Sequence, residues 1–183
     1  MADVKFAFND AKAVEVLAYI VSEWDGISPF YVSKVLFFAE KEHLNAYGRP
    51  IIGDTYIAMD EGPVPSAIRD YINHNFRSIE KPAELDQAVK IEKGKYYRKL
   101  HPGQRKPDMA KLSATDVEEI KKAINFCRGK SRSYLSKITH FEKAWAEAPS
   151  NRAMKYENFI DDKNPHRDEI LEETKEFAVN GVL

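Results

Sequence analysis

Residues 27–71 read ISPFYVSKVLFFAEKEHLNAYGRPIIGDTYIAMDEGPVPSAIRDY, and this stretch decides the fold. Ser28 and Pro29 favour the start of a helix, because Ser can cap free backbone N–H groups and Pro lacks one. Apolar residues then recur at positions 32, 35, 36 and 39, which is the spacing of one helix face. Gly48 can adopt the left-handed conformation that ends a helix. The sequence therefore predicts a helix that begins at Pro29 and stops at Gly48.

The rest of this stretch predicts a strand, a turn and a second helix. Thr55–Met59 alternates briefly, as a strand with one buried face does. Glu61–Val64 is expected to form a turn, because it contains Gly and Pro. Pro65 and Ser66 are expected to open the next helix, whose buried face includes Tyr71.

Shorter elements are expected on either side of this stretch. Asn9 is a good cap for a helix over Lys12–Trp24, and Ala88–Leu100 is expected to form a β-hairpin around Gly94. Met1–Phe8 is expected to be a short edge strand or an arm. The remaining helices are expected after Ser113 or Thr115 (Thr115 and Glu118 have capping-box spacing), after Ser131 or Ser133, within Glu142–Glu147 and within Asp168–Val179.

Together these elements predict a mainly α (α+β) fold. We expect a single compact helical domain over residues 1–183, with five to six helices and a small antiparallel sheet from Thr55–Met59 and the 88–100 hairpin. The core is expected to span about residues 9–148, and residues 149–183 a C-terminal extension with a terminal helix.

Composition narrows the class of protein. The chain has 183 residues, 43% of them hydrophobic and 31% charged, as in ordinary globular proteins. Its net charge of −1 gives no overall attraction to nucleic acid or membranes, so such a partner would need a local patch. No apolar run approaches the roughly 18 residues of a membrane span, and no signal peptide is found, so a cytoplasmic location is expected.

Catalytic and metal-binding motifs are not found. Glu40 and His43 have the spacing used in di-iron helices, but no second Glu-x-x-His exists, so we interpret them as a surface pair. His140 is interpreted as a structural residue, and the single cysteine, Cys127, as a small buried hydrophobic residue. Cys127 alone also excludes an internal disulfide. We therefore predict no enzyme, no cofactor and no metal site.

The segment over residues 90–106 carries the strongest local charge. Its basic residues are Lys90, Lys93, Lys95, Arg98, Lys99, Arg105 and Lys106. Tyr96 and Tyr97 lie among them, and basic residues mixed with aromatic ones can hold nucleic acid. The first two helices could then form a helix-turn-helix with this hairpin as its wing. Glu40 and Glu42 on the second helix would repel phosphate, and lysines also protect strand edges, so nucleic-acid binding is the less favoured alternative.

Several short motifs carry a resemblance to a known family. They are Lys34–Glu40 (KVLFFAE), Tyr47–Pro50 (YGRP), Gly62–Pro65 (GPVP), and Ser133–His140 (SYLSKITH) followed by Trp145. In this order and spacing they resemble the Panacea domain, the SocA-like antitoxin family of type II toxin–antitoxin systems in prokaryotes and phages. The resemblance covers about residues 9–148.

That resemblance implies an antitoxin that neutralises a co-encoded toxin by direct protein–protein contact, with a role in phage defence. Toxic small alarmone synthetases are among the toxins associated with the family. One branch of the family implies a second possibility, a proteolytic adaptor that delivers the toxin to a protease. Two alternatives lie outside the resemblance: a nucleic-acid-binding regulator that uses the 90–106 hairpin and, with less support, a hydrolase built around Asp60, Glu61 and His140.

Aromatic and arginine side chains are the usual anchors of protein interfaces. The Asp60–Glu61 turn is slightly favoured over the hairpin as the main contact with the toxin, because the turn lies inside the resemblance. The alternative for these two acids is a solvated turn or a helix-capping role. The predicted partner-binding residues are Tyr56, Asp60, Glu61, Arg69, Lys95, Tyr96, Tyr97 and Arg98.

Overall fold

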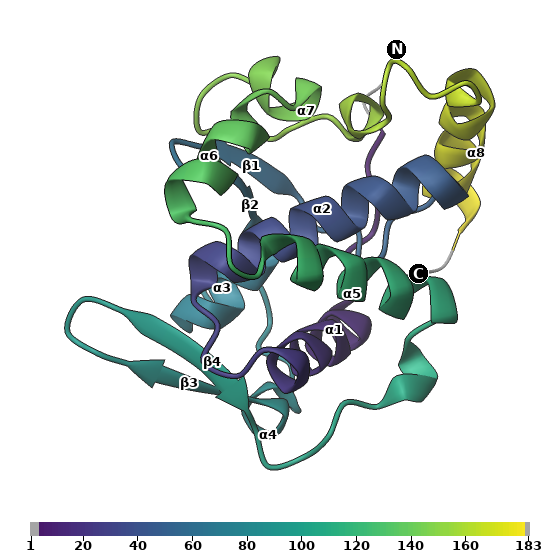
Figure 1. Ribbon diagram of the computed structural model, residues 1–183. Coiled ribbons are helices and arrows are strands. Elements are labelled where there is room, and N and C mark those ends of the chain that lie inside the picture. The colour runs from purple at the N-terminus through teal and green to yellow at the C-terminus, as the bar shows by residue number, and fades with distance from the viewer. Residues whose placement is uncertain (1–3, 182–183) are drawn as a thin grey trace.

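A computed structural model describes residues 4–181, and one helix runs through its centre (Figure 1). This helix, α2 (Pro29–Tyr47), has its predicted bounds, and Gly48 ends it in the left-handed conformation with φ of 65°. Its buried residues include polar ones such as Lys34, Glu40 and His43. A helix enclosed in this way cannot enter a DNA groove, so α2 is not a recognition helix.

The other elements surround α2. Helices α3, α5, α6 and α8 and strands β2 and β4 contact it directly, and the hairpin formed by β3 and β4 projects from the body at the lower left of Figure 1. In chain order the elements are α1 (Asp10–Glu23), α2, β1 (Tyr56–Met59), β2 (Gly62–Pro65), α3 (Ser66–Asn73), α4 (Leu85–Ala88), β3 (Val89–Lys93), β4 (Arg98–Pro102), the 3₁₀ helix η1 (Met109–Lys111), α5 (Ala114–Cys127), α6 (Arg132–His140), α7 (Lys143–Ala146), the 3₁₀ helix η2 (Tyr156–Phe159) and α8 (Arg167–Asn180).

The predicted fold class, mainly α with a small β element, is confirmed. The helix count slightly exceeds the five to six expected. α4 and α7 are single turns of four residues each; α7 lies within the expected Glu142–Glu147 segment, whereas α4 is too short to produce a periodic sequence pattern. Within residues 4–181 no helix is long and apolar enough to cross a membrane.

The β element differs from the prediction of one sheet. β1 pairs with β2 and β3 pairs with β4, giving two separate antiparallel ribbons. The predicted turn over Glu61–Val64 is wrong: Gly62–Pro65 is a strand, and Asp60 and Glu61 form the turn. Two prolines hide this strand in the sequence. They are tolerated because β2 pairs only with β1 among the described strands, so its other edge needs no N–H donors for a ladder.

Helix caps explain why several helices start where they do. Asn9 accepts a hydrogen bond from the backbone of Lys12 at the start of α1, as predicted. α5 is capped by Ser113, whose side chain and backbone exchange hydrogen bonds with Asp116, so the predicted Thr115–Glu118 capping box is wrong. The described part of the N-terminal segment, from Val4 onward, is an arm and not a strand.

Two apolar clusters pack against opposite sides of α2. One joins α1, α2 and α5. The other joins α2 to β1 and the C-terminal segment, where the Phe37 and Phe159 rings lie 5.3 Å apart. Residues 151–154 also hydrogen-bond along the outer edge of β1, through Ala58 and Tyr56. The segment after residue 149 is therefore packed onto the body, and its status as a separate extension stays a prediction.

Candidate functional site

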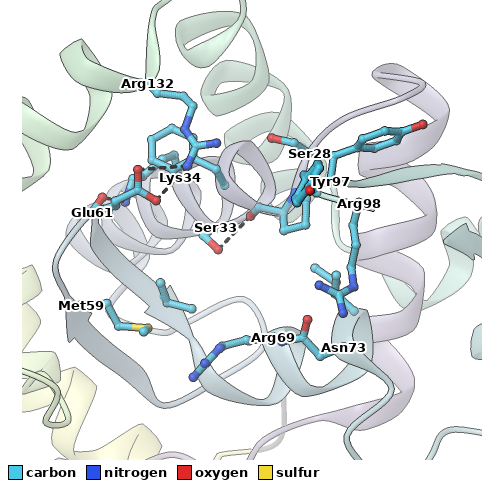
Figure 2. A pocket seen from close by; sticks show the side chains of 15 residues that line it. Ser28, Ser33, Lys34, Met59, Glu61, Arg69, Asn73, Tyr97, Arg98 and Arg132 are labelled. Carbon is cyan, nitrogen blue, oxygen red and sulfur yellow. Dashed lines mark hydrogen bonds and ion pairs between the residues drawn. The ribbon is translucent and has the colours of Figure 1, made fainter. Parts of the chain in front are cut away.

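A cavity of about 360 Å³ opens where the start of α2 meets the β1–β2 turn, α3, α6 and the tip of the β3–β4 hairpin (Figure 2). It unites five of the eight predicted partner-binding residues, namely Glu61, Arg69, Tyr96, Tyr97 and Arg98. The turn and the hairpin, predicted as rival contact sites, thus border the same cavity. The other lining residues are Ser28, Pro29, Phe30, Ser33, Lys34, Met59, Val64, Ile72, Asn73 and Arg132.

Lys34 forms the inner wall of this cavity. Its side chain is almost fully buried, and Nζ donates a 2.6 Å hydrogen bond to the Glu61 carbonyl. Nζ also lies 4.9 Å from the centroid of the Phe30 ring. Burial lowers the pKa of Lys34 to about 8, while the charge of Glu61 acts in the opposite direction. Lys34 was not among the predicted residues, although its spacing from Phe30, Phe37 and Phe38, at i−4, i+3 and i+4, was the available signal.

Gly62 allows the turn to approach Lys34 closely. Its φ is +102°, and a Cβ at this position would lie 2.5 Å from Lys34 Nζ and overlap the Thr139 hydroxyl. Only glycine combines that backbone conformation with so little space. The glycine of the GPVP motif therefore holds the Asp60–Glu61 turn against α2.

Glu61 is already paired at the rim. Both of its carboxylate oxygens accept hydrogen bonds from Arg132 Nη2, at 2.9 and 2.8 Å. Arg132 also stacks over Phe30, with its guanidinium carbon 4.7 Å from the ring centroid. The single carboxylate of the lining is thus neutralised by a cation of the same lining.

Two further arginines of the lining have no such partner. Within residues 4–181, neither Arg69 nor Arg98 makes an ion pair or a hydrogen bond through its guanidinium, and Arg98 Nε is buried without a partner. Figure 2 shows Arg98 beside Tyr97 on one side of the cavity and Arg69 beside Asn73 below it. Guanidinium groups bind carboxylates and phosphates with two parallel hydrogen bonds. The cavity therefore suits an anionic group.

The remaining predicted residues lie elsewhere. Tyr56 is 1% exposed and packs on Phe159 with ring centroids 5.4 Å apart, so the expectation that it contacts a partner is wrong. It occupies the buried face of β1, where the alternation of the strand directs it. Asp60 and Lys95 are exposed next to the cavity without lining it.

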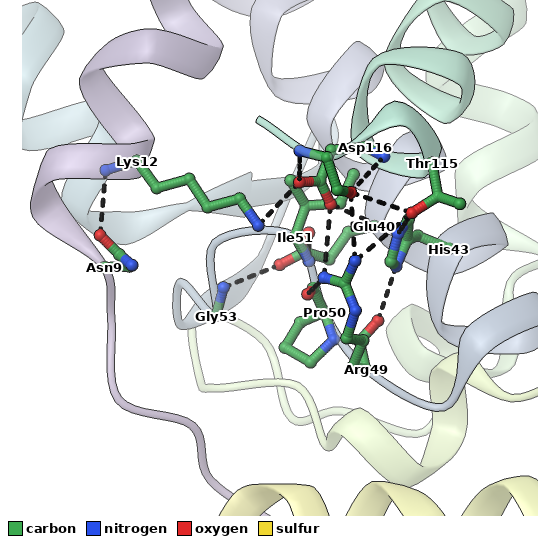
Figure 3. A network of polar contacts seen from close by, with 11 residues as sticks. Asn9, Lys12, Glu40, His43, Arg49, Pro50, Ile51, Gly53, Thr115 and Asp116 are labelled. Carbon is green, nitrogen blue, oxygen red and sulfur yellow. Dashed lines mark hydrogen bonds and ion pairs between the residues drawn. The ribbon is translucent and has the colours of Figure 1, made fainter. Parts of the chain in front are cut away.

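Glu40 and His43 do not form the predicted surface pair; both are buried in a polar network (Figure 3). Glu40 accepts hydrogen bonds from the backbone N–H groups of Ile51 at 2.8 Å and Gly53 at 3.1 Å. Burial nevertheless raises the pKa of Glu40 to about 7. This carboxylate fixes the backbone after Gly48, a role that its sequence spacing alone did not reveal.

The neighbouring half of the network ties α2 to α1 and α5. His43 Nδ1 donates to the Arg49 carbonyl at 2.9 Å, and burial lowers the pKa of His43, so its Nε2 can accept from the Thr115 hydroxyl at 3.0 Å. Asp116 forms a buried ion pair with Lys12 at 2.8 Å. These residues satisfy one another, which indicates a structural role.

The other residues considered for chemistry are also part of the packing. His140 stacks on Trp145 with ring centroids 3.8 Å apart. Cys127 is fully buried, as predicted, and burial raises the pKa of its thiol to about 12, which leaves it protonated near neutral pH. No cluster of three or more His, Cys, Asp or Glu residues suited to a metal occurs in the part of the chain that the structure describes.

Comparison with known proteins agrees with the motifs. A family model described as "Antitoxin SocA-like, Panacea domain" matches residues 32–146, a segment that contains Lys34, Arg69 and Arg98. Comparison with curated proteins and with solved structures found no match. Because the matched segment covers more than half of the 183 residues, the chain belongs to the SocA-like antitoxin family with a Panacea domain.

Proposed function

We propose that this protein neutralises a co-encoded toxin by direct contact, through the face around the cavity. Family membership supports an antitoxin role in general and a toxin as the partner. The observation that carries the proposal is that the Asp60–Glu61 turn and the Tyr96–Arg98 hairpin tip border the same cavity. A toxin that fills the cavity would therefore contact both.

This face has the side chains that anchor protein interfaces. Tyr96 is 86% exposed and Tyr97 is 53% exposed, and they line the cavity together with Arg69 and Arg98, which have no ionic partner within residues 4–181. Exposed tyrosines and arginines next to a concave surface provide most of the binding energy in many complexes. The ion pair between Glu61 and Arg132 then lies at the rim, where a partner can compete for either charge.

A proteolytic adaptor and a nucleic-acid-binding regulator are the two alternative mechanisms. A proteolytic adaptor would use the same contact first and deliver the toxin to a protease afterwards, so it differs in the fate of the toxin. A nucleic-acid-binding regulator has less support, because α2 is enclosed and Arg105 of the basic segment is held by Glu15 and Glu84 at 2.7 Å each.

Co-expression with the protein encoded beside this one tests the proposal. We expect growth arrest by that protein alone and rescue by the wild-type chain. The double variant Tyr97→Ala with Arg98→Ala should lose rescue and co-purification, as should Asp60→Lys with Glu61→Lys. The matched control, Lys90→Ala with Lys93→Ala, changes the same hairpin away from the cavity and should behave as wild type.

The outcomes separate the alternatives. Wild-type rescue by both cavity-face variants would move the interface to the helices after Ser113. Rescue that requires an intact cellular protease, with loss of the toxin over time, would favour the adaptor. Rescue without a stable complex, together with salt-sensitive DNA binding, would favour the regulator.

A further inference from the structure

We propose that the cavity is a binding site for a nucleoside di- or triphosphate. This inference goes beyond the proposed function, because it concerns a small ligand that the purified protein would bind without any toxin. It depends on the size of the cavity, its excess of positive charge and its aromatic wall.

The size fits a small molecule. About 360 Å³ lies within the roughly 300–1,000 Å³ of typical ligand pockets. The walls come from five separate elements, α2, the β1–β2 turn, α3, the β3–β4 hairpin and α6, so a small ligand would be contacted from several sides.

The positive charge of the cavity lining exceeds what one carboxylate of a protein partner would neutralise. Lys34 and the three arginines of the lining face one acid, Glu61, and Arg132 already neutralises it. Lys34, Arg69 and Arg98 remain for a ligand. Nζ of Lys34 makes a single hydrogen bond within residues 4–181, which leaves further N–H donors for a phosphate oxygen. Two or three phosphate groups match this excess of cations.

The start of α2 adds to the same positive field. Ser28 is its N-cap, but the Ser28 side chain makes no capping hydrogen bond, and both Ser28 and Phe30 line the cavity. The first N–H groups of a helix carry partial positive charge and bind phosphate in many proteins. Here the helix end supplements the basic side chains and does not define the site by itself.

An aromatic wall completes the pocket. Tyr96 and Tyr97 both line it, and Tyr97 is oriented by a 3.0 Å hydrogen bond from its hydroxyl to Glu92. Exposed aromatic rings beside arginines stack on nucleobases with little dependence on the base. Asn73, also in the lining, has donors and an acceptor for the edge of a base.

Calorimetric titration of the purified full-length protein with ATP and ADP tests this proposal. We expect saturable binding of one ligand per chain, with pyrophosphate weaker because it lacks the base and adenosine weaker because it lacks the phosphates. Arg69→Gln and Arg98→Gln should each weaken ATP binding about tenfold or more, which corresponds to about 1.4 kcal/mol. Lys93→Gln, on the same hairpin outside the cavity, should leave the affinity unchanged.

Other outcomes would overturn the proposal. No saturation by ATP or ADP up to about 1 mM would do so, as would wild-type affinity in both arginine variants. Binding of an acidic peptide in place of nucleotides would assign the cavity to a carboxylate of a protein partner. A single-stranded oligonucleotide that binds more tightly than ATP would assign it to nucleic acid. The unliganded melting temperature of each variant shows whether it is folded. The toxin rescue assay is separate, so either proposal can fail alone.

Discussion

Two clusters of charged residues lie beside α2, and they differ in whether their members have partners. In the network around Glu40 and His43, each polar group contacts another protein group. In the cavity, Arg69 and Arg98 line a concave surface and have no partner within residues 4–181. A closed network stabilises the fold, whereas charges left open at a cavity are available to a ligand.

We expect removal of one member of the network around Glu40 and His43 to lower the stability of the protein strongly. Asp116→Ala would leave Lys12 buried without its counter-ion and remove part of the α5 cap. Loss of one partner of a buried ion pair costs about 3–5 kcal/mol. Urea denaturation should show a loss of that size, whereas Asp60→Ala, which removes an exposed carboxylate, should change stability by less than about 0.5 kcal/mol. Equal losses would show that Asp116 contributes no more to stability than an exposed carboxylate does.

A pH titration tests the same network through Glu40. Burial raises the pKa of Glu40 to about 7 in the folded state, whereas the unfolded chain has the ordinary value of about 4.3. The unfolded chain loses this proton first, so the free energy of unfolding should fall by roughly 4 kcal/mol between about pH 4.3 and 7, and then level off. Glu40→Gln should flatten that part of the profile relative to wild type. Parallel profiles for the two proteins would show that Glu40 stays ionised when folded.

Local signals in the sequence were enough to predict part of this arrangement. Pro29 and Gly48 mark the ends of α2, because caps and breakers act on their immediate neighbours. The network could not be predicted in this way: His43 and Thr115 are 72 positions apart, and a charged helix residue is by default assigned to the surface.

The cavity was partly predictable for a different reason. Exposed tyrosines and arginines are recognisable interface types, so four of its lining residues were named from sequence for that reason, and Glu61 was named because it lies inside the family resemblance. That the turn and the hairpin meet was not predictable, because it depends on the packing of both against α2. Tyr56 was misassigned, because an aromatic residue type does not reveal its burial.

Substitution of two glycines separates the cost of backbone strain from the cost of crowding beside the cavity. Gly62 and Gly129 both have positive φ, but a Cβ on Gly129 would meet nothing within 4 Å, whereas one on Gly62 would meet Lys34 and Thr139. Gly129→Ala should therefore cost about 1 kcal/mol, and Gly62→Ala about 2–3 kcal/mol, by thermal or urea unfolding. Equal costs would show that Lys34 and Thr139 move aside freely and that crowding does not fix the turn.

The smallest effects on stability are expected from the arginines of the cavity. Arg69→Gln and Arg98→Gln remove charges that have no partner in the described chain, so each should change the free energy of unfolding by less than about 0.5 kcal/mol. Arg105 is the matched case outside the cavity, because its two Nη atoms hydrogen-bond the buried Glu15 at 2.8 and 2.7 Å. Arg105→Gln should cost about 1.5–3 kcal/mol, as loss of a charged hydrogen-bond partner does. If all three substitutions were equally destabilising, the cavity arginines would be part of the folded framework, and their lack of partners would not identify a binding site.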